Sequence, residues 1–178
     1  MLYAFGFDAV GVVVGDLYFV DPEPERGQEG AERGVRLEVR LLAREDLHGS
    51  IYSAQPIVID QPVWRADLLE SVDGPAGSFD RTHHHPRFVG WEPGRRVFEP
   101  RMGDDPVAFV GAELADVHAL MDRARLDPSS VPASDAEALR ETVPEILEVT
   151  RRLLDRVHEG ELARPPAGPV STARVGWL

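Results

Sequence analysis

The sequence contains no cysteine and no lysine, and these absences remove several classes of function. Without thiols the chain can form no disulfide, no thiolate zinc site and no cysteine nucleophile, so a transition metal would need ligands from His, Asp and Glu. The sequence also lacks a Gly-x-Ser-x-Gly elbow, a phosphate-binding Gly-rich loop with Lys and a dinucleotide fingerprint. The absence of these motifs excludes kinase, NTPase and nicotinamide chemistry.

Long apolar runs are missing as well. No stretch reaches the roughly 20 apolar residues that cross a bilayer. The apolar N-terminus has no basic segment and is interrupted by Asp8 and Asp16, so it is predicted to be a strand of the mature protein and not a signal peptide. We therefore expect a soluble, cytoplasmic protein without a membrane partner.

The balance of charge is strongly acidic, with a net charge of -12. Such a surface repels a phosphate backbone, which argues against general nucleic-acid binding. The segment 102–161 carries 14 acidic residues against 6 Arg, whereas 62–101 is balanced with 6 of each. The balanced segment contains the histidine triplet discussed below.

The first hundred residues are predicted to form strands. Apolar residues alternate with charged ones from Val35 to Leu41, the pattern of a half-buried antiparallel strand with one face in water. Gly15-Asp16 is predicted to be a tight hairpin turn. The Asp21–Gly34 stretch is rich in acids, Pro and Gly, and is predicted to be a mobile loop or a lid. Other strand candidates are 12–14, 17–19, 51–54, 57–59 and 63–69, with Pro56 and Pro62 at edges or strand starts.

The next sixty residues are predicted to be helical. One helix should begin at an Asp105 N-cap and continue to Met121, and a second should begin with a Ser134/Glu137 capping box. Pro144 should kink the second helix or divide it in two.

The chain is thus expected to be one α+β domain over 1–178, with an antiparallel meander of about five to six strands and two C-terminal helices on one face. The terminal Trp177-Leu178 pair is expected to dock on the body. The expected parts are a mainly β segment 1–101, with the acidic loop 21–34 and a His loop 74–93, a helical segment 102–161 and an irregular tail 162–178.

Three consecutive histidines mark the one segment that points to chemistry. If the chain before Pro86 is extended, His83 and His85 face one way and His84 the other. A carboxylate from Asp80, Asp67 or Glu92 would complete a nitrogen and oxygen ligand set for Zn, Mn or Fe. We take His83, His85 and Asp80 as the candidate metal ligands, with a polar loop turn as the alternative interpretation. His84 is expected to be structural.

A neighbouring pair extends this site. Arg65 and Asp67 share one face of a predicted strand and, with His83 and His85, would supply an anion clamp and an acid-base pair. The order Arg-x-Asp followed by a loop with His-x-His resembles that of small TumE-like toxins of bacterial toxin–antitoxin pairs, over about Val35 to Val117. That resemblance implies an RNA-directed activity.

Two hypotheses follow. The first is a small hydrolase, dependent on a metal or on histidine and directed at a phosphodiester, with Arg65, Asp67, Asp80, His83 and His85 as its catalytic residues. The second is a non-catalytic acidic binding protein, of an immunity or assembly type, with a small molecule or a protein as its partner.

The first hypothesis makes a geometric prediction. His83 and His85 should turn towards Arg65 and Asp67 and line a pocket, with carboxylates fixing their tautomers. Trp91 is expected to be a core residue or a loop anchor, because apolar residues surround it in the sequence.

Overall fold

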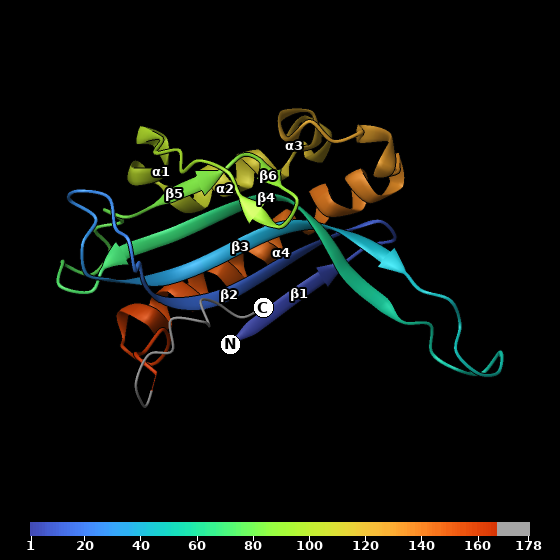
Figure 1. Ribbon diagram of the computed structural model, residues 1–178, viewed down its shortest axis with the longest axis horizontal. Helices are drawn as coiled ribbons and strands as arrows, with labels where there is room; N and C mark the ends of the chain where they lie inside the picture. The colour runs from blue at the N-terminus through green and yellow to red at the C-terminus, as the bar shows by residue number, and fades with distance from the viewer. Residues whose placement is uncertain (167–178) are drawn as a thin grey trace.

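A computed structural model describes residues 1–166 as an antiparallel sheet with helices on one of its faces (Figure 1). The sheet has the order β1-β2-β3-β4-β5, a meander in which each strand pairs with its sequence neighbour. The α+β prediction is therefore confirmed. The strands are β1 (Leu2–Gly6), β2 (Val10–Val20), β3 (Ala31–Arg44), β4 (Ile57–Ser71) and β5 (His83–His85), and a separate hairpin consists of β6 (Phe88–Val89) and β7 (Glu92–Pro93).

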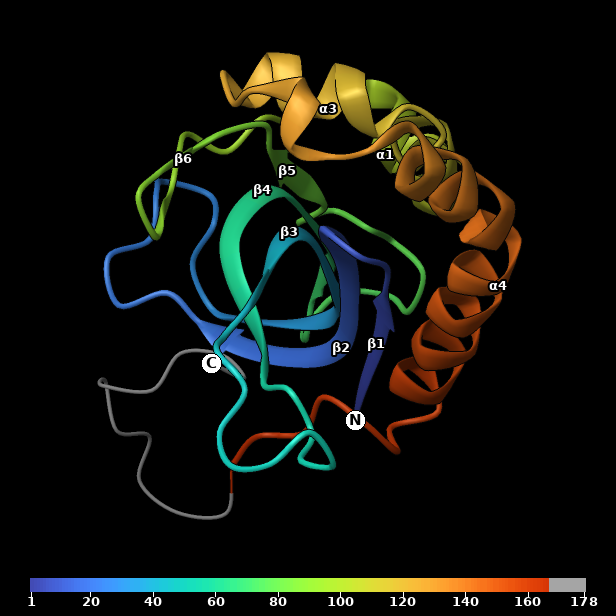
Figure 2. The same ribbon diagram turned by 90° about the vertical axis from the view of Figure 1, so that its right-hand side faces the viewer.

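The helices follow the strands along the chain. The long α4 packs on β2 and β3, α3 packs on β4, and α2 packs on α4. Figure 2 shows α4 along one side of the curled sheet, while β6 lies on the other side. No helix within residues 1–166 is long and apolar enough to cross a membrane. The helices are α1 (Pro100–Asp104), α2 (Pro106–Leu114), α3 (Val117–Ala124) and α4 (Ala133–His158), with the 3₁₀ turn η1 (Pro128–Ser130) before α4.

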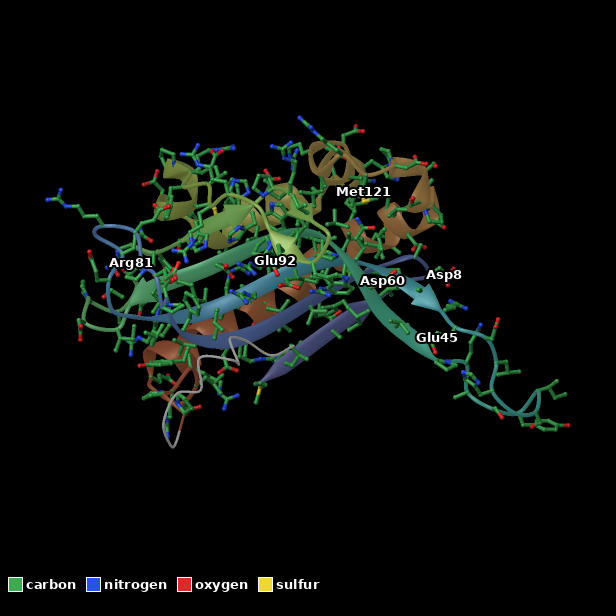
Figure 3. The ribbon with its side chains drawn as sticks, in the orientation of Figure 1. Asp8, Glu45, Asp60, Arg81, Glu92 and Met121 are labelled. Carbon is green, nitrogen blue, oxygen red and sulfur yellow. The ribbon has the colours of Figure 1, made fainter. Side chains whose placement is uncertain are left out.

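The main core lies between the helices and the sheet. Its strand side chains include Leu37, Trp64 and Leu68, and they belong to the same buried cluster as Met121 and Leu139 of the helices. Figure 3 shows Met121 within the helical layer. Since successive strand residues point to opposite faces, this burial also fixes which residues face the other side.

The predicted hairpin at Gly15-Asp16 is wrong. β2 runs without a break through these two residues, which pair with Arg36 and Val35 of β3. The strand candidates on either side of the glycine are therefore parts of one long strand.

The 57–59 and 63–69 candidates are confirmed as strand residues, but they belong to the single strand β4, whose pairing with β3 is irregular near Pro62, where a proline is tolerated. The 51–54 candidate is wrong. Residues 51–54 lie in a connection that contains a turn, and they form no strand.

The histidine triplet is more ordered than predicted. His83–His85 is not a loop but the edge strand β5, paired antiparallel with Arg65, Ala66 and Asp67 of β4. The extended backbone that Pro86 favours is therefore present, and pairing with β4 holds it.

The first predicted helix begins where expected but ends earlier. The Asp105 N-cap is confirmed, since its side chain accepts a hydrogen bond from the N–H of Ala108. The helix ends at Leu114, however, and α3 begins after a new N-cap, Asp116. Within the described residues, four α-helices replace the two that were predicted.

The second predicted helix is one continuous element. α4 runs through Pro144 as a single helix of 26 residues, and it begins at Ala133, so the Ser134/Glu137 capping box does not form. Asp135 in its first turn is buried and accepts a hydrogen bond from the N–H of Ala9 at 2.7 Å, which ties α4 to the β1–β2 turn. The expected docking of Trp177-Leu178 concerns residues outside the described part of the chain.

Candidate functional site

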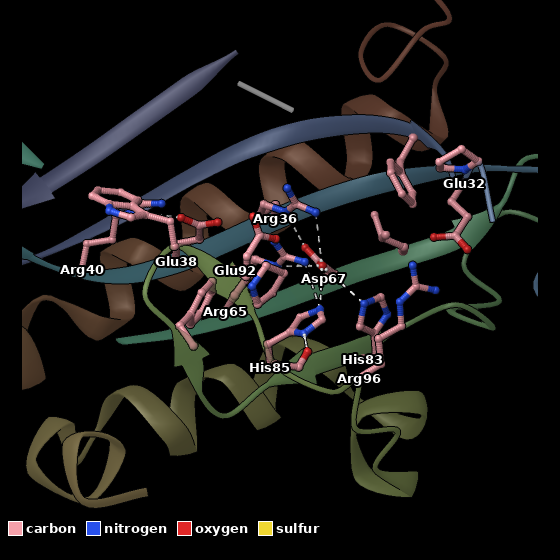
Figure 4. A pocket seen from close by; sticks show the side chains of 17 residues that line it. Glu32, Arg36, Glu38, Arg40, Arg65, Asp67, His83, His85, Glu92 and Arg96 are labelled. Carbon is pink, nitrogen blue, oxygen red and sulfur yellow. Dashed lines mark hydrogen bonds and ion pairs between the residues drawn. The ribbon is translucent and has the colours of Figure 1, made fainter. Parts of the chain in front are cut away.

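The sheet face opposite the helices carries charged side chains. Arg36 of β3, Arg65 and Asp67 of β4, and His83 and His85 of β5 all lie on it, because these residues are paired across the sheet (Figure 4). The geometric prediction is confirmed for the direction of the two rings, since both imidazoles turn towards Asp67 and line a pocket, but not for the groups that fix their tautomers.

The middle histidine points to the other face, as its position in the strand requires. The Nδ1 of His84 accepts a hydrogen bond from the Trp64 indole at 3.1 Å, and its ring packs edge-on against Phe109 of α2. His84 is therefore part of the helix-covered core and not of the site.

Asp67 lies at the centre of the site and is buried. Arg36 donates to both of its oxygens, from Nε at 2.6 Å and from Nη2 at 3.3 Å. The Arg65 Nε lies 3.0 Å from Oδ2, as an ion pair without hydrogen-bond alignment. Burial by itself would raise the pKa of Asp67, but the two guanidinium groups and the two imidazoles hold that pKa well below its usual range. Asp67 is therefore ionised at neutral pH.

The two imidazoles converge on one oxygen of this carboxylate. The Nε2 atoms of His83 and His85 lie 3.4 and 3.6 Å from Asp67 Oδ2, and the two ring centroids are 5.0 Å apart. One ligand atom from each of the three residues lies within 4.8 Å of the others, a set that could hold a metal ion. Two imidazoles and one carboxylate suit Zn, Mn or Fe.

Backbone carbonyls, and not the expected carboxylates, orient both rings. The Nδ1 of His83 lies 2.8 Å from the Arg81 carbonyl oxygen, and the Nδ1 of His85 lies 2.7 Å from that of Gly94. A carbonyl can only accept, so each Nδ1 carries a proton and each Nε2 is directed at the pocket.

The two rings have different surroundings at Nε2. The Arg65 Nη2 lies 3.0 Å from the His85 Nε2 and can donate only to an unprotonated nitrogen. Burial lowers the pKa of His85, which also favours its neutral form. Both Nε2 atoms lie beside Asp67 Oδ2, at 3.4 Å for His83 and 3.6 Å for His85, so the Arg65 contact is what distinguishes the two rings. That contact requires an unprotonated Nε2 on His85, whereas His83 has only acceptors beside its two nitrogens.

Asp80, a predicted ligand and catalytic residue, lies outside this group. Its Oδ1 accepts hydrogen bonds from the Ser71 N–H and the Ser78 hydroxyl, both at 2.9 Å, in the turn between β4 and β5. Asp67 occupies the position that Asp80 was expected to hold. Glu92, the third carboxylate considered, lines the same pocket from β7.

A pocket of about 520 Å³ surrounds the cluster, a volume within the usual range for small-molecule sites. Residues of the β6–β7 hairpin form part of its wall. Trp91 between these strands does not lie in the core. Its side chain is 59% exposed, and its ring lies against the guanidinium of Arg40, whose central carbon is 5.2 Å from the ring centroid.

The charged face of β3 was predicted to be in water, and it is not. Glu38 and Arg40 are buried and joined by a hydrogen bond of 2.7 Å. The regular alternation identified Arg36, Glu38 and Arg40 as neighbours on one face, but no signal in the sequence indicated that a hairpin of later residues covers it.

Glu32 is a further pocket residue that the sequence analysis missed, because it fell within the predicted acidic loop. Residues 31–34 belong to β3, so only 21–30 is a connection. Glu32 is 2% exposed, and neither of its carboxylate oxygens has a hydrogen-bond partner. Burial raises its pKa against the opposing effect of Arg96, His83 and Arg81.

Comparison of the chain with protein-family models, with curated proteins and with solved structures gives no match, so the evidence on function consists of the geometry above.

Proposed function

We propose that the protein is a small hydrolase that cleaves a phosphodiester at the Asp67–His83–His85 site by histidine acid-base catalysis. The observation that carries the proposal is the pair of imidazoles whose Nε2 atoms meet at Asp67 Oδ2 in a pocket lined by arginines. The RNA-directed activity implied by the resemblance to TumE-like toxins falls within the same bond class.

Arg36 and Arg65 would hold the substrate's anionic group. Together they carry two positive charges against the one negative charge of Asp67, so the centre retains attraction for an anion in a poorly solvated place. Guanidinium groups also suit phosphate because their donors match its oxygens in pairs.

The two histidines divide the proton transfers between them. When Arg65 leaves the His85 Nε2 for the substrate's phosphate, His85 accepts the proton of the attacking water as the water oxygen bonds to phosphorus, and His83 gives a proton to the leaving oxygen as the other bond breaks. The different partners of their Nε2 atoms support this assignment. Because the pKa of His85 is lowered, we expect the acid limb of the rate profile to lie below its ordinary value of about 6.5.

A metal-dependent version is the second candidate, favoured by the set of three ligand atoms within 4.8 Å. His83, His85 and Asp67 would hold the ion, which would polarise a phosphoryl oxygen or lower the pKa of a bound water. Arg65 would have to leave its present position beside His85, since its cationic group now contacts both His85 and Asp67. The acid-base version needs the same movement, because Arg65 now donates to the only lone pair of His85, at Nε2, so metal content and EDTA sensitivity separate the two versions.

A non-catalytic acidic protein that binds a partner remains the alternative to an enzyme. Its expected feature was a negative helical face, but the exposed side of α4 carries charges of both signs. A face of mixed charge attracts a basic partner less than a uniformly acidic one, so the pocket is the stronger basis for a function. The exposed charges of α4 are five acids and three arginines, namely Glu137, Glu141, Glu145, Glu148, Asp155, Arg140, Arg151 and Arg152.

The test is hydrolysis of bis(p-nitrophenyl) phosphate by protein purified without a His tag or chelator, with elemental analysis of the same sample. We expect turnover that EDTA leaves unchanged and that falls about 10²- to 10⁴-fold in His85→Gln. His48→Gln is the matched control, because His48 is exposed on the β3–β4 connection.

Each other result has a definite meaning. Stoichiometric metal that disappears in the His83→Ala/His85→Ala variant, with EDTA-sensitive turnover, would replace the acid-base version with the metal version. A folded wild-type protein that hydrolyses neither this ester nor a dinucleotide, with or without added Zn²⁺ or Mn²⁺, would remove the hydrolase proposal.

A further inference from the structure

The carboxylate of Glu32 lies at one end of the pocket, away from the Asp67–His83–His85 cluster (Figure 4). It shares the pocket face of β3 with Arg36, four residues further along, which places the two strand positions about 13 Å apart. Figure 4 shows the two groups separated along the strand, with Asp67 beside Arg36.

The cations nearest Glu32 have other partners. Arg96 donates to Asp21 Oδ2 at 2.8 Å and to Gln28 at 3.3 Å. Arg81 donates to the carbonyl oxygen of Gly27 and forms an ion pair with Asp80. Both oxygens of Glu32 therefore lack a partner within residues 1–166, although the side chain is buried.

A buried carboxylate without partners destabilises a fold, so its presence needs an explanation. The usual structural explanations fail here, because Glu32 caps no helix, and no hydrogen bond or ion pair in the described part of the chain reaches its oxygens. Both oxygens are also covered from solvent, so a group that enters the pocket can pair with them once the side chains over the carboxylate shift.

The surroundings of Glu32 indicate the shape of that group. Phe19 lies directly opposite it on β2 and is only partly buried, and Pro22 and Leu69 line the same part of the pocket. A flat ring can therefore pack on Phe19 while its edge meets Glu32.

From this arrangement we propose that the substrate is a phosphate ester whose other end is a flat ring with two adjacent N–H donors, as on the edge of guanine. The phosphate lies at Arg36 and Arg65, and Glu32 accepts the two N–H groups. The inference rests on the proposed function for its anionic end, and it adds the specificity for the other end. A carboxylate can accept two parallel hydrogen bonds, whereas a ring that presents an acceptor at that edge is repelled.

The test is calorimetric binding of guanosine monophosphate, inosine monophosphate and adenosine monophosphate to the full chain. Inosine monophosphate lacks one of the two donors, and adenosine monophosphate presents an acceptor where guanosine monophosphate has a donor. We expect guanosine monophosphate to bind about 10- to 100-fold more tightly than either, since each hydrogen bond to a charged group contributes roughly a factor of that size.

Glu32→Gln should remove this preference, because the amide offers one acceptor and one donor. It should also fold at least as stably as the wild type, since it removes an unpaired buried charge, so loss of preference cannot be attributed to unfolding. Glu92→Gln, at an exposed position of the same pocket, is the matched control and should keep the preference.

Equal binding of the three nucleotides, no binding of any, or a preference that persists in Glu32→Gln would overturn the inference. Those results leave hydrolysis of bis(p-nitrophenyl) phosphate unaffected, because that ester has no N–H donor. Conversely, selective binding of guanosine monophosphate without phosphodiester cleavage would support the inference and remove the proposed hydrolase activity.

Discussion

The two faces of the sheet come from the same strands and have opposite chemistry. In β4, Trp64, Ala66 and Leu68 pack into the helix-covered core, while Arg65 and Asp67 between them enter the pocket. Both faces are largely buried, but one is held by apolar packing and the other by a charge network. Alternation along a strand therefore allows a stable core and a polar site to be built from neighbouring residues.

The largest effect is expected from removing the charge at the centre of the pocket face, which is the sheet face opposite the helices. Asp67→Asn leaves Arg36 and Arg65 without their carboxylate, and we expect a loss of about 3–5 kcal/mol in the free energy of unfolding together with loss of hydrolysis. Urea unfolding measures the change in the free energy of unfolding. Asp80→Asn is the control and should change stability by less than about 1 kcal/mol, because Asp80 is exposed and the amide keeps an acceptor. Equal effects of the two changes would contradict the central role of Asp67.

The helix-covered face should respond to volume and not to charge. Leu68→Ala removes a fully buried side chain and should lower the free energy of unfolding by about 2–5 kcal/mol. The folded fraction should keep its turnover, since Leu68 does not line the pocket. Ile57→Ala, on an exposed part of β4, should stay within about 0.5 kcal/mol. A Leu68→Ala variant that is stable but lacks the proposed turnover would show that the two faces are coupled.

His84 gives the apolar face a dependence on pH. Burial lowers the pKa of His84 to about 4, below its value in an unfolded chain, so the unfolded state binds more protons between the two values. The contribution of neutral, buried His84 to the free energy of unfolding is fully present above about pH 6.5. It is lost as the pH falls towards 4, and the loss is roughly 3 kcal/mol at most.

The matched variant is His84→Asn, whose side-chain oxygen can still accept from the Trp64 indole but cannot take up a proton in this range. Unfolding followed from pH 7 to 4 should show a shallower slope in this variant than in the wild type. An identical slope would show that the acid sensitivity comes from other groups.

The smallest expected effect on stability is at the rim of the pocket. Trp91→Ala removes a ring that is half exposed but lies against the buried Arg40, so the free energy of unfolding should fall by about 1–2 kcal/mol, between an exposed and a desolvated cation–π contact. KM for an aromatic ester should rise while kcat changes less, because the ring would contact bound substrate and not the reacting atoms. Val89→Ala, exposed on the same hairpin, should alter neither constant. A large loss of stability in Trp91→Ala would show that the ring supports the fold.

Much of the architecture followed from local patterns. The alternation from Val35 to Leu41 predicted a strand, the Asp105-Pro106 pair predicted a helix start, and the extended backbone before Pro86 placed two histidines on one face. Prediction failed where tertiary contacts override local signals. Gly15-Asp16 continues a strand because both neighbouring strands pair with β2, and α4 is not divided in two at Pro144 because its apolar stripe is packed on the sheet.

The sequence by itself determined which side chains share a face of the sheet, because the alternation of side chains in a strand depends only on the order of residues. It thus placed Arg65 with Asp67, and His83 with His85. Only the tertiary structure decided which carboxylate joins the histidines, since register and edge pairing bring Asp67 beside β5 and leave Asp80 in a turn. It also decided that the charged face of β3 is buried, because the covering β6–β7 hairpin comes from residues far along the chain.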